Sequence, residues 1–118
     1  MATQWIANFE LIPASPAVSK ELEGDWEGSL EPMPGSALPV VFHFKNQSDN
    51  TVAATMDSPG RNAMAVPLND VKQTGQKVEF GIRVARASFQ GTLNKEGTGL
   101  AGQFIHESSS TPLTLRKR

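Results

Sequence analysis

The side chains of this chain that could perform acid–base, nucleophilic or metal chemistry are two histidines, several serines and scattered carboxylates. His43 and His106 lie far apart in the sequence, and no aspartate or glutamate cluster accompanies them at the spacing of zinc ligands. Residues 108–110 are three serines in a polar turn, without the Gly-x-Ser-x-Gly pattern of a nucleophile elbow. The glycine-rich loops that bind phosphate between a strand and a helix are also missing. We therefore predict a protein that is not an enzyme and has neither a cofactor nor a metal site.

The expected positions of the histidines follow from the alternation of their neighbours. His43 stands between Phe42 and Phe44, so its side chain is expected to face solvent from a β-strand. His106 has the inward parity of Phe104 but ends its strand, where it either lines a barrel mouth or is exposed. Three acidic residues alternate on the outer face of an earlier strand and are interpreted as a solvated edge: Glu23, Asp25 and Glu27.

Length, charge and cysteine content limit the class of protein. A chain of 118 residues forms one domain and can bury a core. The net charge of −1 disfavours nucleic acid as a partner, and no apolar run approaches the roughly 20 residues of a membrane span. No cysteine is available for a disulfide or a thiolate site. The N-terminus does not have the pattern of a signal peptide, so we expect a cytoplasmic location, or a periplasmic or secreted one if the chain is excised from a longer precursor.

Apolar and polar residues alternate with period two over most of the chain, which predicts β-strands separated by short turns. The eight predicted strands are 25–30, 40–45, 51–56, 63–68, 77–84, 88–93, 100–105 and 113–116. The fourth contains Pro67, which demotes it towards an edge or a bulge. A meander of this kind removes its unpaired edges by closing on itself. The predicted fold is therefore all-β, an antiparallel up-and-down barrel of about eight strands.

Residues 1–22 are predicted to be a lead-in or linker, and residues 23–118 the barrel domain. Prolines make residues 12–16 an extended stretch. Ser15 followed by Pro16 is typical of a helix start, so a short helix is expected from Pro16 to about Leu22, ending at Gly24. The apolar residues further upstream pack on the barrel or bind a neighbouring domain or a second copy: Trp5, Ile6, Phe9, Leu11 and Ile12.

The interior of an eight-stranded barrel is either filled by side chains or holds one small ligand. Six large residues have inward parity, and they either form an ordinary core or line a ligand pocket: Phe42, Phe44, Met56, Phe80, Phe89 and Phe104. Glycines interrupt three of the inward stripes, at Gly28, Gly91 and Gly102. They permit either close approach of coiled strands or room for a ligand, and the usual role of strand glycines favours the first interpretation.

Gly24-Asp-Trp26, at the start of the first long strand, resembles the Gly-x-Trp signature of lipocalins and the wider calycin group. The order of four segments is similar to small lipocalin-like domains of bacterial proteins: 24–30, 90–94, 99–104 and 112–116. Such domains often accompany a serine hydrolase or peptidase domain in one longer chain. The resemblance spans about residues 22–118 and implies a calycin barrel. Two departures from the pattern are Phe104, where such domains often have tryptophan, and the lack of a cysteine pair.

The resemblance also implies a role for the signature tryptophan. In calycins this residue packs at the closed end of the barrel, near a basic residue of the last strand, and Trp26 takes that place here. Its basic partner is one of the last three residues, Arg116, Lys117 and Arg118. Strand parity with Leu115 favours Lys117.

Two functions are open on the sequence. The first is a non-catalytic accessory or binding module, whose partner is a hydrolase or peptidase domain of a longer chain or a second copy. The second is a carrier of a small hydrophobic ligand held by the six inward residues. A nucleic-acid or saccharide binder with an OB fold ranks last, because eight strands exceed the five of that fold.

Overall fold

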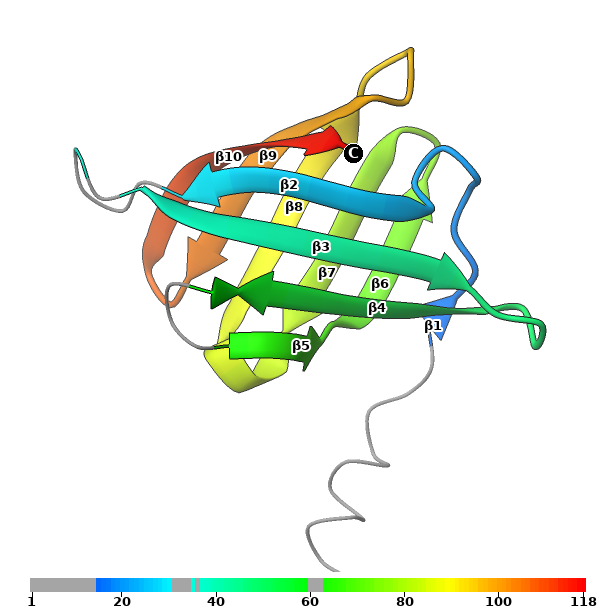
Figure 1. Cartoon of the computed structure of the whole chain (residues 1–118), viewed down its shortest axis with the longest axis horizontal. Coiled ribbons are helices and arrows are strands. Elements are labelled where there is room, and N and C mark those ends of the chain that lie inside the picture. The colour runs from blue at the N-terminus through cyan, green and yellow to red at the C-terminus, as the bar shows by residue number, and fades with distance from the viewer. Residues whose placement is uncertain (1–14, 31–34, 36, 60–62) are drawn as a thin grey trace, which may run out of the picture.

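The computed structural model describes residues 15–30, 35, 37–59 and 63–118, and β-strands dominate it (Figure 1). The strands are β1 (Ser15–Pro16), β2 (Gly24–Leu30), β3 (Leu38–Asn46), β4 (Thr51–Ser58), β5 (Ala63–Pro67), β6 (Asn69–Thr74), β7 (Lys77–Ile82), β8 (Ala87–Leu93), β9 (Gly99–His106) and β10 (Ser109–Lys117). A short 3₁₀ turn, η2 (Arg83–Ala85), connects β7 to β8.

The strands form one antiparallel sheet that curls into a nearly closed barrel of about nine strands. Their order is β1-β4-β3-β2-β10-β9-β8-β7-β6, and β5 pairs with β4 beside this path. Most neighbours are consecutive hairpin strands, whereas the β2–β10 pairing joins the two ends of the domain. In Figure 1, β2, β3 and β4 cross in front of β7 and β8. The prediction of an all-β antiparallel barrel is confirmed.

Side chains, rather than a backbone ladder, connect the two ends of the sheet order, β1 and β6. The Val71 amide donates to Ser15 Oγ over 3.0 Å. Gln73 exchanges two hydrogen bonds with Ser19: the Ser19 amide donates to Gln73 Oε1, and Gln73 Nε2 donates to Ser19 Oγ, each over 2.8 Å. Because Ser15 is buried, this hydroxyl satisfies an amide that would otherwise lack a partner inside the seam.

The helix predicted from Pro16 to Leu22 is wrong. Ser15 and Pro16 form β1, opposite Val52 and Thr51, and the chain then turns over one end of the barrel. The physical reason is burial: Leu22 is fully enclosed, and its packing overrides the local helix-start signal. The part of the lead-in that covers residues 1–14, including the upstream apolar residues, lies outside the described residues.

Two further strand predictions need correction. The predicted strand 77–84 ends at Ile82, and Val84 is 70% exposed on η2 instead of facing inward. Arg86 follows with a left-handed φ of 51°, which turns the chain into β8. Strand β6 was not predicted, because Val71 is its one apolar residue and the polar residues around it have the composition of a turn.

Other predictions agree with the structure. The demoted segment 63–68 corresponds to β5, which pairs only with β4 within the described chain, and a register shift occurs between Met56 and Ser58. The strand glycines mark close approaches: a Cβ on Gly102 would lie 2.0 Å from the Gln90 carbonyl oxygen, and one on Gly28 would lie 2.5 Å from that of Thr114. These glycines therefore allow strands to coil against each other and do not create ligand space.

Candidate functional site

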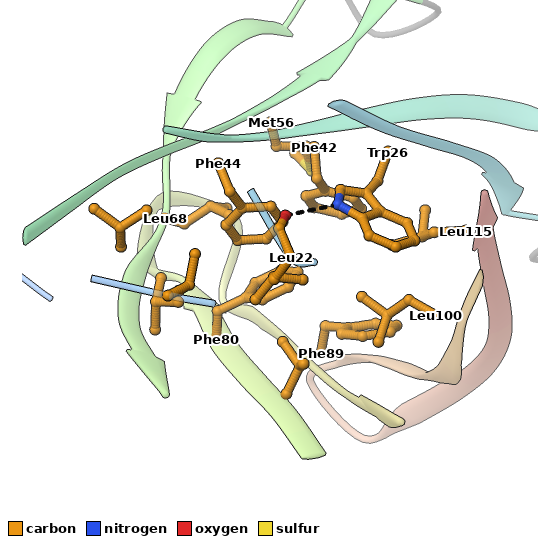
Figure 2. Close-up of a cluster of buried hydrophobic side chains, with 14 of the residues drawn as sticks. Leu22, Trp26, Phe42, Phe44, Met56, Leu68, Phe80, Phe89, Leu100 and Leu115 are labelled. Atoms are coloured by element: carbon orange, nitrogen blue, oxygen red, sulfur yellow. Dashed lines mark hydrogen bonds between the residues drawn. The ribbon is translucent and has the colours of Figure 1, made fainter. Parts of the chain in front are cut away.

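The closed end of the barrel is the end covered by residues 17–23, on the right in Figure 1. Leu22 and Trp26 are both fully buried there. The Trp26 indole N–H donates to the Leu22 carbonyl oxygen over 2.8 Å, the bond drawn in Figure 2. This bond satisfies both the indole and a buried backbone carbonyl, so it fixes the covering segment on the first long strand.

Lys117 completes the closed end, as strand parity predicts. It pairs with Trp26 across β2 and β10, and its Nζ lies 5.8 Å from the centroid of the indole. The same ammonium donates to the Glu21 carbonyl oxygen over 2.8 Å. Arg118 instead forms an exposed ion pair with Glu27 over 3.2 Å. Lys117 is therefore the basic residue that joins the last strand, the tryptophan and the covering segment.

Four of the six predicted pocket residues fill the middle of the barrel: Phe42, Phe44, Phe80 and Phe89 (Figure 2). The ring centroids of Phe42 and Phe80 lie 5.0 Å apart, and those of Phe80 and Phe89 lie 5.2 Å apart. Each of the four is at most 2% exposed. Contacts of this kind make a packed aromatic core, so for these four residues the structure agrees with the first of the two alternatives, an ordinary core.

The opposite end, which we call the open end, contains a cavity of about 430 Å³. Met56 and Phe104, the other two predicted pocket residues, line it. The remaining lining residues are Leu30, Leu38, Val40, Ser58, Ala63, Val66, Val84, Ala85, His106, Ser109 and Thr111. The volume lies in the lower part of the range of about 300–1,000 Å³ that is typical of small-molecule sites.

The wall of this cavity is mainly apolar, with a small polar area. His106, Ser109 and Thr111 come from the β9–β10 hairpin, whereas Ser58, which is 5% exposed, comes from β4. Sequence reasoning left His106 open between a barrel mouth and simple exposure, and the structure places it at the mouth and exposed. The hydroxyl residues were missed, although inward parity with Leu113 could have indicated Thr111 and Ser109.

A cluster of titratable groups lies away from the cavity, on the outer face of β2, β3 and β4. His43 Nδ1 lies 2.7 Å from Asp25 Oδ1, and its Nε2 lies 2.8 Å from Asp57 Oδ2. Asp57 also accepts a hydrogen bond from the Ala65 amide of β5 over 2.7 Å. His43 faces outward as predicted, but the sequence interpretation missed this cluster because its members meet only through strand pairing.

The two carboxylates favour the charged imidazole ring. Hydrogen bonds to Asp25 and to Asp57 raise the pKa of His43, against a smaller opposing effect of burial. The hydrogen bond from the Ala65 amide, followed by that from His43, lowers the pKa of Asp57. A ring that donates from both nitrogens to carboxylates is an imidazolium, so this arrangement stabilises three strands and leaves no ring nitrogen free for a substrate.

The carboxylates lie on opposite sides of the His43 ring, so their oxygens and the ring nitrogens do not converge on one point. Within the described ranges, no group of three or more histidine or acidic side chains is placed to hold a metal ion. The described residues also include no helix that is long and apolar enough to cross a bilayer.

No protein-family model matches the chain, and no curated protein matches it in sequence. These comparisons therefore show no family for the chain, and its fold rests on the geometry of the barrel.

Proposed function

We propose that the domain is a non-catalytic binding module that takes a small, mainly apolar ligand into the open-end cavity. The observation that supports this function is the contrast within one barrel between a packed middle and a lined space of about 430 Å³ at one end. Protein interiors are close-packed, and voids larger than a water molecule are few. A mainly apolar space with a few polar groups at its mouth is the usual form of a small-molecule site.

The arrangement of the titratable groups supports a non-catalytic role. His43 has both ring nitrogens engaged by carboxylates, so it has no free nitrogen with which to activate a nucleophile. His106 faces the cavity near Ser109, but within the described chain no carboxylate orients its ring. A nucleophile, a base and an orienting group therefore do not come together among the described residues.

The ligand function is tested with a fluorescent apolar dye and a matched pair of variants on β10. Thr111→Trp places an indole in the cavity, whereas Thr114→Trp adds the same side chain on the exposed outer face. We expect the wild type and Thr114→Trp to bind the dye with the same dissociation constant. Thr111→Trp is expected to weaken binding at least about tenfold, because the indole occupies the ligand volume.

Circular dichroism and thermal unfolding establish that each variant retains the fold. Equal dye binding by all three folded proteins would place the dye elsewhere on the surface and contradict the proposed site. Failure of the wild type to bind any member of a panel of apolar dyes and fatty acids would contradict the ligand function itself.

An accessory role is a second candidate, and two exposed apolar side chains favour it. Among the described residues, Met64 is 62% exposed and Val84 is 70% exposed, so both side chains are available to contact another surface. We propose that they contact a second copy, or a neighbouring hydrolase or peptidase domain of a longer chain. A concentration-dependent dimer in sedimentation velocity, abolished by Met64→Ser with Val84→Ser, would support the second copy, and a monomer at all concentrations would exclude it.

We also propose kinship with the lipocalin-like domains. The arrangement of Leu22, Trp26 and Lys117 at the closed end supports it, because the Gly-x-Trp signature implies a tryptophan near a basic residue of the last strand. Sequencing related chains tests this: relatives should retain tryptophan and a basic residue at positions 26 and 117, and independent variation of the two would argue against kinship.

A further inference from the structure

The polar side chains of the open-end cavity are concentrated on one hairpin. His106 ends β9, and Ser109 and Thr111 lie at the start of β10. His106 and Ser109 are directly paired, and Thr111 pairs with Phe104, so all three polar residues lie on the inward face of two neighbouring strands. Apart from Ser58, the other lining residues are apolar. The cavity therefore has a polar side and an apolar side.

The polar groups on that side have unused hydrogen-bonding capacity. Within the described chain, no hydrogen bond links the His106 ring or the hydroxyls of Ser109 and Thr111 to another residue. Other polar residues of the same types differ: Ser110 of this hairpin donates to Gln103 over 2.9 Å, and His43 on the outer face of β3 has both ring nitrogens engaged. Donors that line a cavity and remain unpaired are available for a ligand.

The charges near this mouth favour an anion over a cation. Among the described residues that line the cavity there is no carboxylate, and His106 is the one titratable group. Arg83 and Arg86 lie on either side of Val84 and Ala85, the η2 residues that form part of the wall. Two acids are adjacent in sequence to lining residues, Glu107 after His106 and Asp57 before Ser58. Asp57 is engaged on the outer face by His43 and the Ala65 amide, so it does not enter the cavity. The described wall therefore has no carboxylate that would repel an anionic group.

We propose that the cavity's ligand is a short amphiphile with a carboxylate head, bound with the head at His106, Ser109 and Thr111. Its apolar body lies against β2–β5 and η2. This assignment rests on the proposed binding function and adds the chemical class and the orientation of the ligand. A carboxylate accepts several hydrogen bonds at once, which matches one imidazole and two hydroxyl donors.

The cavity volume limits the length of the ligand. About 430 Å³ corresponds to roughly fourteen waters at about 30 Å³ each. A carboxylate with a chain of about eight carbons, which has ten non-hydrogen atoms, fits within this space. Octanoate and 1-octanol are therefore suitable probes, because they share the chain and differ in the charge of the head.

Isothermal titration calorimetry of the whole chain with these two probes tests the proposal. We expect octanoate to bind the wild type at least about tenfold more tightly than 1-octanol, the scale of a charge-assisted hydrogen bond. His106→Ala should reduce this ratio to within about twofold, because it removes one of the three head-group donors and the loss is larger for the charged head than for the hydroxyl. His106 is exposed at a strand end, so the variant is expected to fold.

Lys95→Ala is the matched control, because it also removes a basic group from an exposed position. Lys95 lies in the β8–β9 turn, which is close to the closed-end cover: a Cβ on Gly97 would lie 3.2 Å from the Glu21 Cβ. The control should keep the tenfold preference. Equal binding of both probes by the wild type, or an unchanged preference in His106→Ala, would overturn the carboxylate assignment while the cavity function stands. Binding of neither probe, together with failure of the dye panel, would overturn both.

Discussion

At the closed end of the barrel, Leu22 and Trp26 are fully buried under a covering segment, whereas at the open end Phe104 and His106 face a cavity of about 430 Å³. Both ends are built from the same strands. The difference comes from what the chain adds at each end. On one side is a turn fixed by hydrogen bonds to Trp26 and Lys117. On the other side is a hairpin whose polar side chains in the cavity have no hydrogen-bond partner within the described part of the chain. We therefore propose that stability depends mainly on the closed end and ligand binding on the open end.

The largest expected effect is at the closed end. Trp26→Ala should reduce the free energy of unfolding by about 3–5 kcal/mol, because it leaves a cavity and removes the donor to the Leu22 carbonyl. Chemical denaturation monitored by circular dichroism measures the change. Trp26→Phe, which keeps an aromatic ring but lacks the N–H, should cost less. A loss below about 1 kcal/mol in the alanine variant would contradict the structural role of this end.

A matched pair of phenylalanines compares the core with the cavity wall directly. Phe89 and Phe104 are paired across β8 and β9, but Phe89 is fully buried and Phe104 is partly buried at the cavity. We expect Phe89→Ala to cost about 3–5 kcal/mol and Phe104→Ala about 1–2 kcal/mol of unfolding free energy. Only Phe104→Ala should alter dye binding. Equal losses of unfolding free energy in the two variants would contradict the difference between a packed core and an open cavity wall.

Much of this architecture was predictable, because period-two alternation reports which strand face is buried. The inward parity of Phe42, Phe89 and Leu115 is correct in the structure, and so is the choice of Lys117 beside Trp26. The division of the barrel interior into a packed middle and a cavity at the open end was not predictable from the sequence. Parity placed Phe80 and Phe104 on one inner surface, but the depth of each along the barrel axis depends on strand stagger, which a single sequence does not specify.

The other errors also have local physical causes. The helix signal at Ser15 and Pro16 was overridden by pairing with β4 and by burial of Leu22. The cluster around His43 depends on registers that bring Asp25 directly opposite it and Asp57 within reach. Cross-strand partners of this kind lie far apart in sequence, so no short sequence motif predicts them.

Substitutions of Lys117 and Arg118 test the closed end through a change in unfolding free energy of intermediate size. Lys117→Met should lower the free energy of unfolding by about 1 kcal/mol, through loss of the hydrogen bond to the Glu21 carbonyl and of the contact with the indole. Arg118→Met should change it by less than about 0.5 kcal/mol, because its ion pair with Glu27 is exposed. Urea unfolding at one pH compares them. A larger effect of Arg118→Met would contradict the assignment of Lys117.

The smallest expected effect is the pH dependence of stability that arises from the His43 cluster on the outer face. The pKa of His43 is raised in the folded state, so its contribution to stability is complete below its ordinary value of 6.5 and is lost as pH rises through the folded value. The pKa of Asp57 is lowered, so its contribution is present above 3.8 and is lost as pH falls towards the folded value. The cluster therefore stabilises the fold most between about pH 4 and 6.5.

Thermal unfolding measured from pH 5 to 8.5 detects the upper limit of this window. The unfolding temperature of the wild type should fall as the His43 proton is lost, and His43→Gln should remove that part of the dependence. The described charged groups on the strands around the ring and just after β10 are Asp25, Glu27, Lys45, Asp57 and Arg118. An identical pH profile in His43→Gln would show that another of these groups, or His106, is responsible.

The most direct test of the difference between the two ends is a nuclear magnetic resonance titration of the labelled wild type with octanoate. Amide signals of the cavity wall, such as those of Leu38, Val66 and Thr111, should shift with one shared dissociation constant. The indole N–H signal of Trp26, held by the Leu22 carbonyl at the closed end, should stay in place. Shifts concentrated around Trp26, or no saturable shifts at the open end, would contradict the assignment of binding to the cavity.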